Sequence, residues 1–143
     1  MTALARSKPI PVPDAASAPF FAGALRGELM LLRCGVCATF QSPTAYLGVP
    51  LRPRCVRCFA AELEWAPASG RAKLHSYALM HKVYDEAFAA DVPYNIAIVE
   101  TEEGVRLTSQ VIECDALEIG MALEVTFERL GDEVAIPKFR PRR

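Results

Sequence analysis

The sequence predicts a mainly β protein in which a short N-terminal helix and a small cysteine-rich ribbon precede a five-stranded barrel of the OB type. Two observations lead to this order. Four of the five cysteines form two CxxC pairs in the first half of the chain, and five short strand-like segments separated by turn residues follow after Trp65. A chain of 143 residues corresponds to one ordinary domain or two very small ones.

The N-terminal part is predicted to be a flexible leader followed by one helix. Residues 1–16 are rich in proline and alanine, a composition that suits extended, mobile chain. Residues 17–29 are predicted to form a helix, because Ser17 can cap its start and apolar residues recur every four positions. This apolar stripe either packs on the protein itself or docks onto a partner. The candidates for docking are Phe20, Phe21 and Leu25.

Residues 30–64 are predicted to form a metal-binding ribbon. Its four cysteines are Cys34, Cys37, Cys55 and Cys58, with seventeen residues between the two pairs. Each CxxC turn lets two thiolates converge on one ion, and two such turns complete a tetrahedron. Zinc is the expected ion, and iron is the alternative, which the red colour of a ferric tetrathiolate would reveal. Because protein sulfurs fill all four positions, the site is expected to be structural, and so small a ribbon is expected to need its metal to fold.

Two other interpretations of the four cysteines are weaker. Two disulfides would need an oxidising compartment, whereas the N-terminus has no apolar segment typical of a secretion signal, so we expect a cytoplasmic protein. A redox CxxC would need an accessible, low-pKa cysteine in a βαβ context, which the pattern does not show. The fifth cysteine, Cys114, lies between two acidic residues that would raise its pKa, and we interpret it as inert.

Residues 65–143 are predicted to form the OB barrel with a basic C-terminal tail. Alternation of apolar and polar residues is clearest from Leu123 to Glu128. Glu103-Gly104 and Gly131-Asp132 are predicted to be tight turns. The five predicted strands are Lys73–His81, Tyr94–Glu100, Val105–Ile112, Leu123–Glu128 and Val134–Phe139.

No catalytic constellation is visible in the sequence. The only two histidines, His75 and His81, are six residues apart on one predicted strand and would therefore share a face, but no serine or cysteine triad can be assembled around them. The loop from His81 to Pro93 is more apolar than a surface loop should be. It is expected to line a ligand or partner site, or to form a small helix over the end of the barrel. Its candidate contact residues are His81, Tyr84, Phe88 and Tyr94.

Charge is distributed unevenly along the chain. From Trp65 to Pro137 there are five basic and thirteen acidic residues, a net charge of −8, although the whole chain carries only −1. A negatively charged barrel is unsuited to nucleic acid, whose binding depends on neutralising phosphates, so an OB-fold or zinc-ribbon nucleic-acid binder is the alternative function and not the preferred one.

The order of these elements resembles the DUF35 family, in which a rubredoxin-like zinc ribbon precedes an OB-fold. The resemblance covers residues 17–141. Ala38 and Phe59 depart from it, because a glycine or another small residue often follows each cysteine pair. Beyond the helix residues Phe20-Phe21 and Leu25, the matching segments are Leu31–Cys37, Pro53–Cys58, Gly70–Tyr77, Pro93-Tyr94, Val99-Glu100, Gly104–Leu107, Ile119–Met121 and Pro137–Pro141.

The resemblance implies a non-catalytic accessory subunit of a thiolase-type complex that processes acyl-CoA, in which the catalytic residues belong to the partner. The acyl-CoA site would lie at or near the interface, and the complex would act in the degradation of aromatic, steroid or other acyl-CoA intermediates. Because the barrel is acidic, only the tail or the ribbon arginines are candidates for contacting CoA phosphates. These candidates are Lys138, Arg140, Arg142, Arg143, Arg52 and Arg54.

Overall fold

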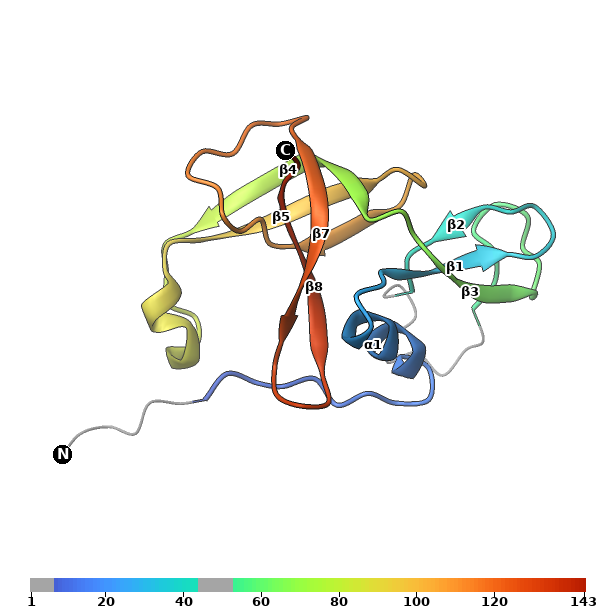
Figure 1. The fold of residues 1–143 in the computed structure, drawn as a ribbon, viewed down its shortest axis with the longest axis horizontal. Coiled ribbons are helices and arrows are strands. Elements are labelled where there is room, and N and C mark those ends of the chain that lie inside the picture. Colours follow the sequence, from blue (N-terminus) through green and yellow to red (C-terminus); the bar gives the residue numbers. More distant parts are fainter. Residues whose placement is uncertain (1–6, 44–52) are drawn as a thin grey trace.

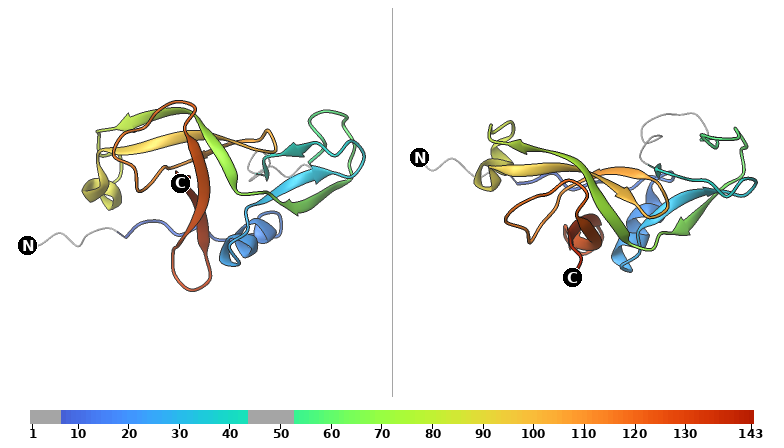
Figure 2. Two further views of the ribbon diagram at one scale, coloured as in Figure 1. Left: turned by 45° about the horizontal axis from the view of Figure 1, so that its top comes forward. Right: turned by 90° about the horizontal axis from the view of Figure 1, so that it is seen from above.

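The fold was analysed in a computed structural model that describes residues 7–43 and 53–143. One short helix, α1, is followed by eight named strands, with a 3₁₀ helix, η2, between β4 and β5. Figure 1 shows two sheets side by side, and the two views in Figure 2 confirm that η2 lies at the end of the larger sheet away from the smaller one. The bounds are α1 Ala18–Leu25, β1 Met30–Cys34, β2 Phe40–Gln41, β3 Leu63–Pro67, β4 Arg71–Met80, η2 Glu86–Asp91, β5 Tyr94–Thr101, β6 Arg106–Ser109, β7 Ala122–Arg129 and β8 Ala135–Pro141.

The smaller sheet carries the cysteine ribbon. Its strand order is β2-β1-β3, and both pairings are antiparallel. Strand β1 is buried at four of its five positions, and its Leu31 packs into the hydrophobic core. The register places Leu32 opposite both Gln41 and Trp65. This sheet therefore fixes the position of the first cysteine, Cys34, at the end of its central strand.

The larger sheet is a curled half-barrel with the order β6-β5-β4-β7-β8, which agrees with the predicted OB-fold. Only the first three residues of β4 pair with β7, whereas β4 pairs with β5 along its length. A parallel bridge between Val111 and Phe139 brings the two edges of the curled sheet together. The backbone N–H of Phe139 donates to the carbonyl of Gln110 at 3.0 Å, and the Phe139 carbonyl accepts from Ile112 at 2.8 Å.

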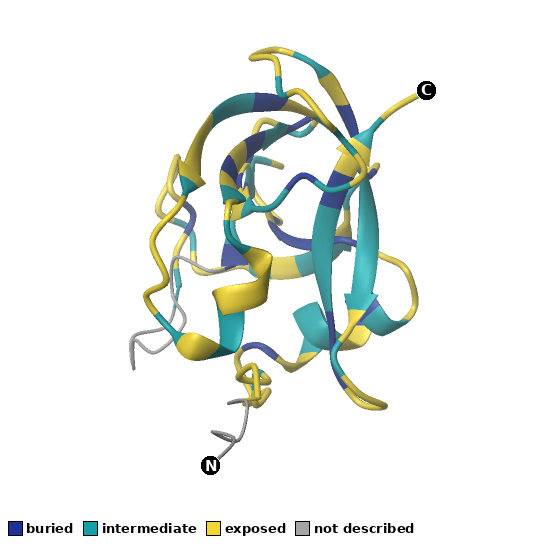
Figure 3. Ribbon diagram, turned by 90° about the vertical axis from the view of Figure 1, so that its left-hand side faces the viewer, coloured by how far each residue is buried: buried dark blue, intermediate teal, exposed yellow. Residues whose placement is uncertain are grey.

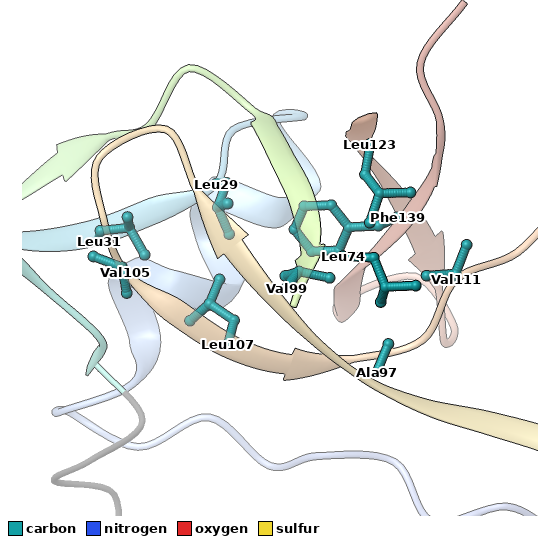
Figure 4. Close-up of a cluster of buried hydrophobic side chains, with 10 residues drawn as sticks. All are labelled: Leu29, Leu31, Leu74, Ala97, Val99, Val105, Leu107, Val111, Leu123 and Phe139. Carbon is teal, nitrogen blue, oxygen red and sulfur yellow. The ribbon is translucent and has the colours of Figure 1, made fainter. Parts of the chain in front are cut away.

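One hydrophobic core serves both sheets. Figure 4 shows Leu31 of β1 and Leu29, just before that strand, beside the side chains of the half-barrel. Leu29 and Leu31 are 2% and 0% exposed, and they belong to the same buried cluster as Phe139, which is 0% exposed. In Figure 3 the buried segments lie mainly on the strands, whereas η2 and the turns are mostly exposed. The ribbon and the half-barrel are thus held together by shared apolar packing as well as by the chain.

The five predicted barrel strands are present, and Gly104 occupies a tight turn with positive φ. Gly131 also has positive φ, but it lies in a longer connection, residues 130–134, between β7 and β8. The prediction that His75 and His81 share a strand face does not hold. Strand β4 ends at Met80, and its register shifts between Leu74 and Ser76, so the period of two is interrupted at His75. The carbonyl of Leu74 at this bulge accepts instead from the N–H of Gly120 at 2.7 Å.

Helix α1 is shorter than the predicted 17–29 because a glycine ends it. Gly27 has φ +79°, and the N–H groups of Gly27 and Glu28 donate to Ala24 and Gly23, the pattern of a Schellman stop. At the other end, Ser17 caps the helix by position but not with its side chain. Its hydroxyl and N–H donate instead to the carboxylate of Asp14, and these hydrogen bonds lower the pKa of Asp14.

Replacing Gly23 with alanine is expected to destabilise the protein by about 1–2 kcal/mol, because overpacking costs about 1–3 kcal/mol and a gain in helix propensity of about 1 kcal/mol offsets part of it. A Cβ at this position would lie 2.2 Å from Met30 Cγ. Urea unfolding measures the change. The same substitution in a Met30→Ala background should cost clearly less, and equal losses in both backgrounds would contradict the packing explanation.

The predicted leader and the apolar loop meet in the structure. Lys8 Nζ lies 2.6 Å from Asp91 Oδ2 and 5.5 Å from the ring centre of Phe88. The loop forms η2, whose start is capped by the carboxylate of Asp85, which accepts from Ala87 N–H at 2.9 Å. The predicted small helix is therefore present. The mobility of residues 1–16 and the division into domains remain predictions.

No helix in residues 7–43 and 53–143 is long and apolar enough to cross a membrane.

Candidate metal centre

The four predicted cysteines come from two similar turns that face each other. The first turn follows β1 and runs from Cys34 to Cys37, and the second, from Cys55 to Cys58, precedes β3. In each turn the first cysteine makes the same two backbone hydrogen bonds. Cys34 donates to Thr39 and accepts from Ala38, and Cys55 donates to Ala60 and accepts from Phe59, at 2.9–3.0 Å throughout. We call these segments, 34–39 and 55–60, the two knuckles.

The sulfur geometry fits a tetrahedral metal site. Cys34 Sγ lies 3.6 Å from Cys58 Sγ, Cys37 Sγ lies 3.5 Å from Cys55 Sγ, and all four sulfurs are within 4.8 Å of one another. Metal–sulfur bonds of about 2.3 Å in a tetrahedron require sulfurs about 3.8 Å apart. All five cysteines of the chain are free thiols, and the sulfurs are much farther apart than the roughly 2.05 Å of a disulfide. The cluster can therefore hold one metal ion.

Backbone amides point at the buried sulfur of each knuckle. Cys34 Sγ accepts from Val36 at 3.3 Å and from Cys37 at 3.4 Å, and Cys55 Sγ accepts from Arg57 at 3.4 Å and from Cys58 at 3.5 Å. These dipoles stabilise negative charge on sulfur, which a metal-bound thiolate carries. Cys34 and Cys55 are each 1% exposed, so the amides act where water does not compete.

The surroundings shift the pKa values of the cysteine thiols in different directions. Hydrogen bonds from the Thr39 side chain and backbone lower the pKa of Cys37 to about 6, and the backbone hydrogen bond of Cys58 lowers the pKa of Cys55. At Cys58 a hydrogen bond from the Ala60 backbone lowers the pKa, but desolvation and the three neighbouring thiols outweigh it and raise the pKa to about 12. Binding of a metal would displace these protons, because the metal ligand is the thiolate.

A buried glutamine joins the second knuckle to the sheet. Gln41 is 5% exposed, its Oε1 accepts from Val56 N–H at 2.9 Å, and its Nε2 donates to the Arg54 carbonyl at 3.1 Å. The first knuckle is held by Gly35 N–H, which donates to Glu62 at 2.7 Å. Sequence reasoning did not single out Gln41. The neighbouring residues Thr39 and Ser42 are polar, so the sequence carries no apolar pattern that would mark Gln41 as buried.

Ala38 and Phe59, which depart from the usual small residue, both have left-handed backbone conformations. Their φ angles are +64° and +65°, at equivalent places in the two knuckles. This region costs a residue with a side chain roughly 1–2 kcal/mol. The conformation at Phe59 is enforced by two hydrogen bonds. Its N–H donates to Cys55 at 3.0 Å, and its carbonyl accepts from Arg54 Nη1 at 3.1 Å.

The cations predicted to contact CoA phosphates are mostly engaged with other groups. Lys138 pairs with Glu128 and donates to Gln110 Oε1 at 2.9 Å. Arg140 lies 2.9 Å from Glu124 and 3.7 Å from Glu113. Arg54 donates to the Phe59 carbonyl, and Arg52 lies outside the described residues. Arg142 and Arg143 at the end of the chain form no ion pair within the described part, and they remain the candidates best placed to meet a phosphate.

One of the four predicted loop residues, Tyr94, lines a groove formed by described residues. This groove of about 900 Å³ lies at the η2 end of the half-barrel, and Tyr94 contributes to its wall together with Tyr77 and Leu79. The ring of Phe88 is 6.4 Å from that of Tyr94, whereas His81 is exposed and Tyr84 is 69% exposed under the ammonium of Lys82. The four candidates therefore do not form one cluster around a single site.

The predicted docking residues of the helix face their own protein at least in part. Phe20 packs against the shared core, and its ring meets that of Phe21 edge-on at 5.4 Å. Phe21 and Leu25 are half-buried. The structure thus favours internal packing for Phe20, and a docking role for this helix remains a prediction.

Comparisons with known proteins agree with this architecture. A family model described as the C-terminal OB-fold domain of ChsH2 matches residues 65–128. A "DUF35 domain-containing scaffold protein" of Methanocaldococcus jannaschii is 36% identical over 121 residues, which cover 79% of this chain and 81% of that protein. A "Probable enoyl-CoA hydratase alpha subunit" of Thermomonospora curvata is 29% identical over 94% of this chain, but the chain spans only 40% of that relative.

Among solved structures, a chain of the "Ltp2-ChsH2(DUF35) aldolase" superposes with a TM-score of 0.74 and 29% identity, over 92% of this chain and 98% of that one. The sequence match to the Methanocaldococcus jannaschii protein extends over most of both chains, and the structural match includes the cysteine ribbon and the half-barrel together. On these grounds the protein belongs to the DUF35 family.

Proposed function

We propose that this protein is a zinc-bearing, non-catalytic subunit of an enzyme complex that processes acyl-CoA thioesters, and that it scaffolds a thiolase-like catalytic partner. The observation that carries the proposal is the similarity of nearly the whole chain to a DUF35 chain of an Ltp2–ChsH2 aldolase, together with its similarity to a protein named a scaffold. A second relative is named a hydratase subunit, so two of the related proteins are named for enzyme complexes.

The chemistry of the site supports a structural role. Four sulfurs surround the metal position, so an ion there would have no open site for substrate or water. Zinc is the ion that best fits four thiolates in a closed tetrahedron without redox chemistry. Bound there, zinc would fix the two knuckles relative to each other and to the sheet.

Two of the remaining reactive side chains, His75 and Cys114, make contacts within the fold. His75 Nδ1 lies 3.9 Å from Glu100 Oε2 on the neighbouring strand, and Cys114 Sγ donates to the carbonyl of Ala116 at 3.1 Å. In the described ranges neither histidine forms a hydrogen bond with a serine or cysteine. These contacts support a complex in which the partner supplies the catalytic groups.

Electrostatics supports an acyl-CoA site shared with the partner rather than held by this chain alone. Residues 65–141, which include β8, contain seven basic and thirteen acidic residues, a net charge of −6, and Lys138 and Arg140 are paired with carboxylates. Phosphates would therefore be repelled from most of the barrel surface. The isolated chain is expected to bind acetyl-CoA more weakly than about 1 mM in isothermal titration calorimetry, which corresponds to about −4 kcal/mol. Micromolar binding would contradict the shared site.

Co-expression with a thiolase-like subunit from the same organism tests the function. The two chains are expected to co-purify through size-exclusion chromatography, and thioester turnover by the catalytic subunit is expected to fall at least tenfold when this chain is omitted. Purified subunit added back should restore turnover. A catalytic subunit that is equally active and stable without this chain, and that never co-elutes with it, would contradict the proposal.

A further inference from the structure

The two knuckles expose apolar side chains next to the metal site. Val36 is 67% exposed, Val56 is 62% exposed and Phe59 is 73% exposed. All three belong to the turns that carry the cysteines, at the end of the ribbon sheet. Valine and phenylalanine side chains gain free energy by leaving water, so their exposure on a small ribbon calls for an explanation outside the isolated chain. We call these three residues the knuckle-tip patch.

The backbone conformation of Phe59 is a second reason to expect a binding role. Its φ of +65° is a conformation that glycine adopts without strain and that a bulky residue rarely adopts. The equivalent residue of the first knuckle, Ala38, has nearly the same angle but only a methyl group. The fold gains little packing from Phe59, which is 73% exposed, while its Cβ adds strain at this φ angle. An exposed ring at a strained position points to a role in binding.

Phe59 is also held firmly in place. The metal knuckle fixes its N–H through Cys55, and Arg54 fixes its carbonyl. Gln41 ties the neighbouring Val56 to the sheet at 2.9 Å. With the backbone fixed, only the side-chain torsions of the ring have to be ordered on binding, which lowers the entropic cost for an interface anchor.

The charges around the patch indicate what kind of surface it fits. Residues 34–43 and 53–62 contain two arginines, Arg54 and Arg57, and one acidic residue, Glu62, whereas residues 65–137 carry −8. Arg57 lies between Val56 and Cys58 and is exposed. A complementary surface would therefore combine an apolar socket for the ring with carboxylates at its rim.

We propose that the knuckle-tip patch is the anchor by which this chain holds its catalytic protein subunit, with Phe59 inserted into an apolar, acid-rimmed socket of that subunit. The inference rests on the proposed function, because it names the surface that contacts the partner. It gives the metal a specific task, which is to hold the second knuckle in the conformation that presents Phe59.

A matched pair of substitutions tests the anchor. Phe59→Gly and Ala38→Gly both relieve a left-handed residue in equivalent knuckles, so each is expected to raise the melting temperature by roughly 2–5 °C. Their effects on binding should differ. With the purified catalytic subunit immobilised for biolayer interferometry, Phe59→Gly is expected to raise Kd at least tenfold, whereas Ala38→Gly should leave Kd within twofold of the wild type.

Two further variants complete the experiment. Phe59→Asn, which also tolerates the left-handed region, should weaken binding as Phe59→Gly does, while Phe59→Tyr should retain it. Arg57→Glu is expected to slow association severalfold at low salt. Each variant is checked for one bound metal per chain. If Phe59→Gly and Phe59→Asn bind the catalytic subunit as tightly as the wild type does, the anchor proposal is wrong but the proposed function stands. If the wild-type chain itself binds no catalytic subunit, the proposed function is contradicted as well.

Discussion

Replacing Cys55 with serine is expected to abolish metal binding and to unfold the ribbon. Cys55 is 1% exposed and its sulfur accepts two backbone N–H groups, so a serine oxygen would be a poor substitute both as ligand and as packing atom. Structural zinc contributes roughly 10–16 kcal/mol of binding free energy in small finger peptides at neutral pH. The hydrogen bonds within the knuckles and between them and their neighbours are each worth only about 1 kcal/mol, so together they should not replace the metal.

Unfolding of the ribbon should also destabilise the half-barrel, because Leu29 and Leu31 belong to the core that both sheets share. The single tryptophan, Trp65, lies in β3 opposite Leu32 and reports on the ribbon by fluorescence, while far-ultraviolet circular dichroism reports on both sheets. We expect the ribbon signal to be lost at room temperature and the remaining β signal to melt at a lower temperature than in the wild type.

Elemental analysis provides the direct measurement. The wild type should contain one zinc per chain and be colourless, and Cys55→Ser should contain none. Cys114→Ser is the matched control, since Cys114 lies outside the cluster and should leave metal content and melting unchanged. Wild-type protein that is folded and soluble with no bound metal, or a Cys55→Ser variant that keeps one zinc per chain, would contradict the structural role of the site.

The parts of this structure that sequence predicts well are those with a local pattern. The cysteine spacing predicts the knuckles because a CxxC turn defines its own geometry. The strands of the half-barrel were predicted within a few residues because one face of each is buried, which imposes a period of two. The same logic fails at His75, where a bulge shifts the register of β4 and no residue type at that position announces it.

Features that depend on distant contacts could not be predicted. The apolar spacing of Phe21, Leu25 and Leu29 favoured a helix through residue 29, but Gly27 ends α1, and Leu29 instead enters the core shared with the half-barrel. A four-residue repeat cannot distinguish a helix face from two separate elements that pack on one core. The sequence of the basic tail likewise does not predict that Arg140 pairs with Glu113 and Glu124, which are distant along the chain.

Phe139 illustrates how such distant contacts close the barrel. Its side chain is fully buried in the shared core, and its backbone bridges to Val111 across the gap between the two edges of the curled sheet. The ring therefore fills the space that the curling of the sheet creates, and the backbone hydrogen bonds on either side of it depend on that packing.

Replacing Phe139 with alanine is expected to destabilise the protein by about 3–5 kcal/mol, because it removes a full ring from the core and leaves a cavity. Urea unfolding followed by circular dichroism measures this loss, and Phe139→Leu, which keeps most of the volume, should lose clearly less. The matched control is Phe59→Ala, whose ring is 73% exposed, so that its removal should change the free energy of unfolding by less than about 0.5 kcal/mol. Equal effects at the two phenylalanines would mean that Phe139 does not hold the barrel closed. The contrast also separates the two aromatic roles, since Phe139 is expected to act on folding and Phe59 on association.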